Sequence, residues 1–227
     1  MKKSFEGALK VLALAVAMSI SAAASAQSAG TWFAKAGVNK ITPKVDSGAM
    51  SAPALPNTKA DVGSDTEVLF AGGYMLTDNI STELDLGWPY THEFFGDGSI
   101  KGSGKIGTAE VLPPTLFIQY RFLEAKSAFR PYVGLGLTYA YFRKETGSGK
   151  LTAITNTGSA TPTTFTLDNK VALTPQIGVT YAINDKWFLD GVVTKTFLKT
   201  TTHFSSGQTL DIKLDPVAIS LAVGYKF

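Results

Sequence analysis

The chain has 227 residues with no Cys, 22 Gly and 14 Phe, and 17% of its residues are charged, for a formal net charge of +3. The absence of Cys excludes disulfide scaffolds, thiol catalysis and Cys-based zinc sites, and the small, evenly spread charge argues against nucleic-acid binding. High Gly and aromatic content with low charge is unlike a helical soluble enzyme, and the length suits one domain.

The N-terminal segment, residues 1–26, predicts a cleaved secretory signal peptide. Basic residues precede an apolar stretch at Val11–Met18, and small residues at Ala24–Ala26 form the cleavage site. An uncleaved membrane anchor is the alternative, which the short apolar stretch and the small residues after it disfavour. We therefore expect an exported protein with one domain over residues 27–227.

The rest of the chain is dominated by a period of two, which predicts β-strands. In the last segment, Val217, Ile219 and Leu221 share one face, whereas Ser220 and Gly224 lie on the other. The eight predicted strands cover residues 31–42, 67–77, 80–91, 108–123, 129–143, 171–182, 187–199 and 210–227. Each is near the roughly 9–11 residues that a tilted strand needs to cross a bilayer.

The connections between these strands alternate in length. Short ones lie at 78–79, 124–127 and 184–185, and long ones at 43–66, 92–107, 144–170 and 200–209. This pattern is typical of an outer-membrane barrel with short periplasmic turns and long extracellular loops. The alternative, a soluble sandwich or lipocalin-like barrel, is disfavoured because aromatic residues such as Trp88 and Tyr225 end the apolar faces, as membrane girdles do.

Several segments resemble the outer-membrane protein W family of small Gram-negative barrels. They are WFAKAG (32–37), TDNI (77–80), LPPT (112–115), FRPYVGLG (129–136), QIGVTY (176–181) and LDPVAISLAVGYKF (214–227). The resemblance implies an all-β, eight-stranded antiparallel barrel in the outer membrane, in contact with membrane lipids. It also implies a narrow apolar lumen and passage of small hydrophobic molecules sideways into the membrane through a gap in the wall.

Two details qualify this resemblance. Phe227, with Tyr225 on the same face, resembles the signal that the barrel-assembly machinery reads, which makes that machinery an expected partner. Position 111 is Val, whereas enterobacterial members of the family have His there, so any role of that His does not transfer.

Charged residues at inward positions near the short turns predict a polar floor across the lumen. They are Lys35, Glu83, Asp85, Arg121, Arg130, Asp190 and Lys226. Because an unpaired buried ion costs several kcal/mol, we expect these groups to form ion pairs that close the axial route at the periplasmic end. The alternative is a polar core that only holds the strands in register.

Above this floor, small and apolar residues are expected to line the lumen. They are Ala71, Gly73, Met75, Phe117, Ala140 and Gly178. Such a lining suits an apolar solute, although the same residues would also simply fill a small barrel.

Prolines within predicted strands are the sharpest local signal. A Pro cannot donate to a strand ladder, and a closed barrel has no free edge to hide it on. Pro113 and Pro114 fall inside the fourth predicted strand beside Leu112, and Pro89 falls in the third. We expect these four residues to form a lateral gate, the alternative being that pairing has already ended at that height.

Other chemistries find little support in the sequence. Some outer-membrane barrels are lipid-modifying enzymes with a His, a Ser and an acidic residue at the outer face. The candidates here, His92 with Glu93 and His203 with Ser205, Ser206 and Asp211, have no recognisable catalytic spacing. No cluster has metal-ligand spacing, so we expect no metal, no cofactor and no enzyme activity. A receptor or structural barrel acting through its loops, such as the long segment 144–170, remains the alternative to transport.

Overall fold

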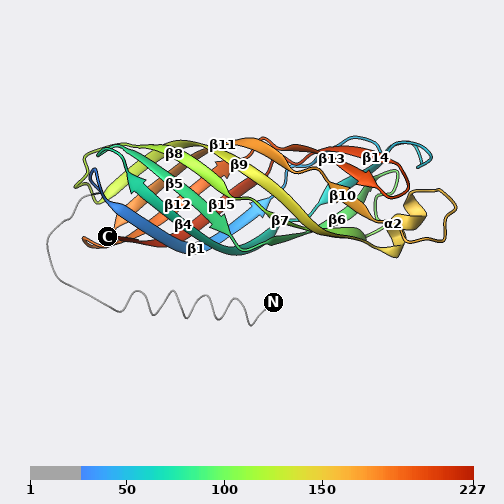
Figure 1. Cartoon of the computed structure of the whole chain (residues 1–227), viewed down its shortest axis with the longest axis horizontal. Helices are drawn as coiled ribbons and strands as arrows, with labels where there is room; N and C mark the ends of the chain where they lie inside the picture. Colours follow the sequence, from blue (N-terminus) through green and yellow to red (C-terminus); the bar gives the residue numbers. More distant parts are fainter. Residues whose placement is uncertain (1–26) are drawn as a thin grey trace.

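The computed structural model describes residues 27–227, so the expected signal peptide, 1–26, lies outside the described residues. The chain forms a closed, eight-stranded antiparallel barrel, which confirms the predicted fold class (Figure 1). The barrel strands are β1 (Trp32–Thr42), β4 (Asp65–Met75), β5 (Ile80–Gly87), β8 (Thr115–Arg121), β9 (Phe129–Gly147), β11 (Lys170–Ala182), β12 (Trp187–Lys195) and β15 (Val217–Lys226). The first and last strands close the barrel, with Ala36 opposite Val223, and β9 pairs with β11.

The segments expected as long loops are largely folded, which corrects the sequence interpretation. They contain β2 (Asp46–Ser47), β3 (Thr58–Val62), β10 (Phe165–Leu167), the short helix α2 (Gly149–Ile154) and most of β6 (Tyr90–Gly98) and β13 (Lys199–Phe204). The predicted strands 108–123 and 210–227 are each divided in two, and their outer parts belong to β7 (Lys105–Leu112) and β14 (Thr209–Lys213). Figure 1 shows these elements continuing the barrel at the end away from the C-terminus, with α2 at the tip. Among residues 27–227, no helix is long and apolar enough to cross a membrane.

Buried apolar side chains hold this extension together. Met50, Ile106, Leu151, Phe165 and Phe204 belong to one buried cluster, and the rings of Phe165 and Phe204 lie 6.3 Å apart. The ring of Phe94 also lies 5.6 Å from that of Phe165, so these side chains pack against one another. The same cluster includes Ile41 on β1 and Ala218 on β15, so the extension is stabilised by a core that continues into the barrel.

The outer surface of the barrel is apolar. Leu116 and Leu221 are 57% and 65% exposed, and many other large aliphatic side chains on the barrel strands are also exposed. Trp32 and Trp88 are exposed near strand ends, as in the aromatic girdles of membrane barrels. A soluble barrel would turn this face inward, so the alternation places lipid outside and a narrow lumen inside.

The C-terminal residues belong to an aromatic cluster on the outer surface at the short-turn end. Phe227 is 77% exposed, its ring lies 5.2 Å from Tyr225, and Tyr225 lies 4.9 Å from Trp187. The proposed assembly signal is therefore exposed, and its recognition by an assembly machinery stays a prediction.

Candidate functional site: the lumen and a break in the barrel wall

Aromatic side chains plug the barrel at the short-turn end. Phe33, Met75 and Phe188 form a buried cluster, with the two rings edge to face at 6.1 Å. The glycines opposite make room for these rings, because a Cβ at Gly73 would overlap Phe33 and one at Gly224 would overlap Phe188. Gly73 and Met75 were expected above the floor, but they lie with this plug, because β4 runs toward the short turn.

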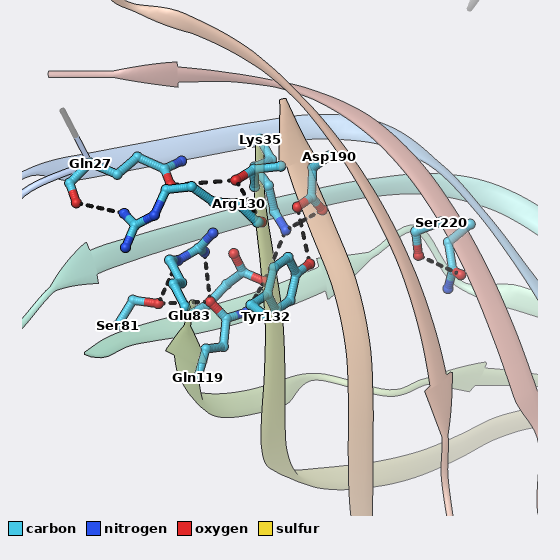
Figure 2. A network of polar contacts seen from close by, with 12 residues as sticks. Gln27, Lys35, Ser81, Glu83, Gln119, Arg130, Tyr132, Asp190 and Ser220 are labelled. Carbon is cyan, nitrogen blue, oxygen red and sulfur yellow. Dashed lines mark hydrogen bonds and ion pairs between the residues drawn. The ribbon is translucent and has the colours of Figure 1, made fainter. Parts of the chain in front are cut away.

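An ionic network crosses the lumen next to the plug (Figure 2). The ammonium of Lys35 lies 3.0 Å from Oε1 of Glu83 and 2.8 Å from Oδ1 of Asp190, and all three side chains are only 1% exposed. The hydroxyl of Tyr132 donates to Oδ2 of Asp190 over 3.0 Å. These four residues, from β1, β5, β9 and β12, are called the lumen network below, and they tie opposite walls together.

Arg121 joins the lumen network without an ion pair, which corrects its expected role. Its guanidinium donates to Ser81 over 3.1 Å and to Gln119 over 2.7 Å, and Gln119 in turn donates to Glu83. The guanidinium carbon lies 4.8 Å from the centre of the Tyr132 ring, within the range of a cation–π contact. Arg121 is therefore held by amide, hydroxyl and aromatic groups.

Arg130 also departs from the expected ion pairing. It donates to the backbone carbonyls of Gln27 at 2.9 Å and Asp78 at 2.6 Å. Arg130 therefore ties the segment before β1 to the short turn between β4 and β5. Arg130 and Lys226 line a separate cavity of about 170 Å³ at this end. Among the charged residues expected in the floor, Lys35 forms ion pairs with Glu83 and Asp190.

An apolar cavity of about 100 Å³ lies on the other side of the lumen network. Most of the surface of this upper cavity is apolar, and its apolar lining includes Leu69, Tyr90, Val111, Pro113, Phe117 and Ala140. Its polar lining residues are Asn39, Asp85, His92, Thr115, Thr138, Thr174, Thr194, Thr196 and Ser220. Phe117 and Ala140 were expected to line the lumen. Ala71 and Gly178, also expected there, lie elsewhere: Ala71 is opposite Lys35 in the β-ladder, and a Cβ at Gly178 would overlap the Tyr132 ring.

The barrel wall beside the upper cavity is broken on one side. Strands β5 and β8 pair as far as Asp85 opposite Thr115, and pairing resumes between β6 and β7 only at Tyr90 opposite Val111. The residues between these two pairs include Pro89, Leu112, Pro113 and Pro114. Prolines have no backbone N–H, so they cannot restore the ladder at this height.

Both borders of this wall break stay attached to their other neighbours. The amide of Tyr139 donates to the carbonyl of Pro114 over 3.0 Å, which holds this border to β9. The amide of Trp88 donates to the carbonyl of Val68 over 2.9 Å, which holds the opposite border to β4. The wall break is therefore a local interruption of pairing within an otherwise closed barrel.

Sequence reasoning overlooked several polar residues of the lumen. Ser81, Gln119 and Tyr132 are almost fully buried and complete the lumen network, yet they were not among the expected site residues. The sequence spacing could have identified them, because each lies two positions from a charged residue that was expected in the lumen. Ser81 precedes Glu83, Gln119 precedes Arg121, and Tyr132 follows Arg130 at this spacing. A strand places such residues on the same face.

The residues considered for lipid-modifying chemistry are occupied in structural contacts. Nδ1 of His92 lies 2.7 Å from the carbonyl of Gly63, and burial lowers the pKa of His92, which lies on β6 in the extension. Nε2 of His203 lies 3.3 Å from Oδ1 of Asp168. Ser205 accepts from the amide of Thr164, and Ser206 donates to Gln208. In the described part of the chain, no group of three or more acidic or His side chains is arranged to hold a metal ion.

Comparisons with known proteins give one consistent result. Residues 28–227 match the model of the OmpW family. Outer membrane protein W of Vibrio cholerae serotype O1 is 36% identical over 222 residues, which cover 95% of this chain and 97% of that protein.

Solved structures agree with this match. The chain is similar to the crystal structure of outer membrane protein OprG from Pseudomonas aeruginosa, with a TM-score of 0.80 and 26% identity over 90% of this chain and 99% of that one. It is also similar to the solid-state NMR structure of outer membrane protein AlkL in DMPC bilayers, with a TM-score of 0.64 and 26% identity over 92% and 94% of the two chains.

Proposed function

Because this chain belongs to the OmpW family and is an outer-membrane β-barrel, we propose that it takes up small hydrophobic molecules and releases them sideways into the membrane. The solute enters the upper cavity from the extracellular extension. It leaves through the wall break, because the plug and the lumen network occupy the axial route beneath the cavity.

One observation carries this proposal: the apolar cavity borders the interruption in backbone pairing. Gly87, Tyr90, Val111 and Pro113 line the upper cavity, and the same residues lie at or beside the wall break. A solute in the cavity is therefore separated from the lipid only by side chains at this height. Moving side chains costs far less than breaking a ladder of backbone hydrogen bonds, which supports lateral exit here.

Glycine shapes the border of this exit. A Cβ at Gly87 would lie 2.9 Å from the ring of Tyr90, closer than ordinary van der Waals contact. The lack of a side chain at Gly87 lets the Tyr90 ring lie against the border, where its hydroxyl accepts a hydrogen bond from Asn39 over 2.9 Å. The cavity wall is thus held in place on the side of β5 and β6.

The double substitution Pro113→Val and Pro114→Val tests the proposal. Two new backbone donors allow the ladder toward β5 and β6 to continue, so we expect protein-dependent uptake of n-octane to fall severalfold. Uptake is measured as the initial rate in Gram-negative cells that lack their own copy, minus the rate in cells without the protein.

The matched control is Pro56→Val with Pro162→Val, two exposed positions in the extracellular extension. Folding of each variant is checked by its heat-dependent migration in SDS gels. Unchanged uptake in a folded Pro113→Val/Pro114→Val variant would contradict the lateral exit. No protein-dependent uptake in the unaltered protein would contradict transport and favour a receptor or structural role.

A further inference from the structure

Lys195 lies on the lipid-facing side of the barrel wall, where charged side chains are rare. It shares the outer face of β12 with Val193, and the next outward residue beyond it is Phe197, which is 54% exposed. Its ammonium donates to the backbone carbonyl of Asp215. A lysine is tolerated at the edge of the hydrocarbon, where its stem lies along apolar groups and its ammonium reaches the polar layer. Lys195 therefore marks the height at which the lipid-facing surface ends on this side.

Four further lysines lie on the same outer face, on β1, β13 and β14 and directly after β1. Lys199 and Lys213 are cross-strand partners, and Lys40 is the cross-strand partner of the lipid-facing Ile219. The backbone amide of Lys44 donates over 2.8 Å to the carbonyl of the residue that follows Lys213. Together with Lys195 they form a group that is called the lysine patch below: Lys40, Lys44, Lys195, Lys199 and Lys213.

Acidic side chains balance only part of the charge of the lysine patch. One carboxyl oxygen of Asp215 lies 3.3 Å from Nζ of Lys213, and the other accepts a backbone amide over 3.0 Å. Asp46 is the cross-strand partner of Lys213 on β2. Asp211 lies one outward position further from the barrel on β14 and accepts from the hydroxyl of Thr201. Three acids therefore accompany five lysines, which leaves two positive charges in excess.

Lys40, Lys44 and Lys199 are exposed and form no ion pair with another described residue, whereas Lys213 contacts Asp215. Lys199 and Lys213 also repel one another, because like charges directly opposite in an antiparallel pair are destabilising. The fold gains no stability from placing these two ammonium groups side by side. An anion bound from outside the chain would remove the repulsion.

The lysine patch lies where the lipid-facing surface of the barrel ends on the extracellular side. Toward the short turns, the outward residues next to it are apolar, such as Val193 and Ile219, which are 42% and 56% exposed. Away from the short turns, β13 and β14 belong to the extension (Figure 1). A ligand at the lysine patch would therefore meet ammonium groups with its polar part and aliphatic side chains with its apolar part.

This combination fits a phosphorylated glycolipid. The outer leaflet of an outer membrane contains lipid A, whose phosphate groups are carried by a sugar headgroup directly above its acyl chains. Charge-assisted hydrogen bonds from ammonium groups to phosphate are strong, and basic residues at a membrane surface attract anionic headgroups. The height of the lysine patch, at the upper edge of the apolar surface, is the height of these phosphates.

We propose that the lysine patch binds the phosphate groups of lipid A, while the acyl chains lie along the apolar outer face of β1, β12 and β15. The site lies away from the proposed exit, because β15 is separated from β5 by β1 and β4, and β12 is separated from β8 by β11 and β9. Lipid A is therefore held on the wall opposite the wall break, and its binding does not depend on transport.

The test replaces the three lysines of the patch that contact no acid, by Lys40→Gln, Lys44→Gln and Lys199→Gln together. The unaltered and altered proteins are placed in phosphatidylcholine nanodiscs that contain a small fraction of lipid A. The lipid A that stays bound after transfer to mild detergent is measured by native mass spectrometry. We expect bound lipid A to fall about tenfold in the triple variant. Lipid A without its phosphates should bind the unaltered protein at the same low level.

The matched control is Lys101→Gln, Lys126→Gln and Lys150→Gln, which removes the same charge at exposed positions outside the lysine patch and should leave bound lipid A unchanged. Folding of both variants is checked by heat-dependent migration in SDS gels. Equal binding of lipid A with and without phosphates by the unaltered protein would overturn the inference, whatever the variants do. An equal loss in the control variant, or displacement of lipid A by inorganic phosphate alone, would also overturn it.

Discussion

At the scale of single residues, the lumen shows how buried charge is arranged in a narrow barrel. Lys35 contacts two carboxylates, and Tyr132 donates to one of them. Arg121 lies over the Phe33 and Tyr132 rings at 5.3 and 4.8 Å. Each contact offsets part of the cost of removing these ions from water, so the network depends on every partner being present.

Replacing Lys35 by Met should therefore destabilise the barrel strongly. The variant leaves Glu83 and Asp190 buried without their cation, and the loss of one partner of a buried pair costs about 3–5 kcal/mol. The free energy of unfolding by urea, measured for the protein in lipid bilayers, checks this value. The triple variant Lys35→Met, Glu83→Gln, Asp190→Asn removes the charges together and should recover much of the loss; an unaltered stability of the single variant would refute the ionic role.

At the scale of elements, the strands divide into a lipid-facing barrel and an extension packed on the same buried core. Leu116 on β8 is 57% exposed, and Leu55, before β3, is 54% exposed. The two side chains have similar exposure, but Leu116 lies on a barrel strand with apolar neighbours and Leu55 lies in the extension. The difference between them is the solvent that each one meets, lipid or water.

The substitutions Leu116→Arg and Leu55→Arg test this division. An arginine facing the hydrocarbon near the bilayer midplane costs about 2–4 kcal/mol, and the cost falls to about 0–1 kcal/mol near the interface. We expect the free energy of unfolding by urea in bilayers to fall by about 2–4 kcal/mol for Leu116→Arg. For Leu55→Arg we expect almost no change. Similar losses for the two variants would show that the membrane boundary does not separate the barrel from its extension.

At the scale of the whole molecule, one closed barrel holds a plug, an ionic network and a cavity along its axis. The plug and the network lie on the short-turn side, and the cavity is bordered by the wall break. An eight-stranded barrel has an interior that side chains can fill. The proposed lateral exit rests on this arrangement.

Ion conductance checks this arrangement directly. The purified protein in planar bilayers should carry no large, steady aqueous current, because the plug and lumen network occupy the axial route. A general porin of larger strand number serves as the positive control. Large, steady currents from a folded preparation of this protein would show that the lumen is open along its axis.

Local sequence pattern was sufficient for the membrane-barrel class and for most barrel strands. The period of two in residues such as Val217, Ile219 and Leu221 depends only on strand geometry, so it can be recognised without knowing the neighbouring strands. The prolines at 89, 113 and 114 were recognisable for the same reason, since a missing N–H is a property of the residue itself.

Only the tertiary structure decided which side chains meet. Lys35 and Asp190 are 155 positions apart in the chain, and their contact depends on strand register and on the tilt that closes the barrel. The positions of Gly73 and Met75 beside the plug and the contact of Arg121 with Gln119 depend on the same long-range geometry. So do the strands that form within the expected loops. Residue parity determines which face a side chain occupies, but the height of that side chain and its partner across the lumen come from the folded barrel as a whole.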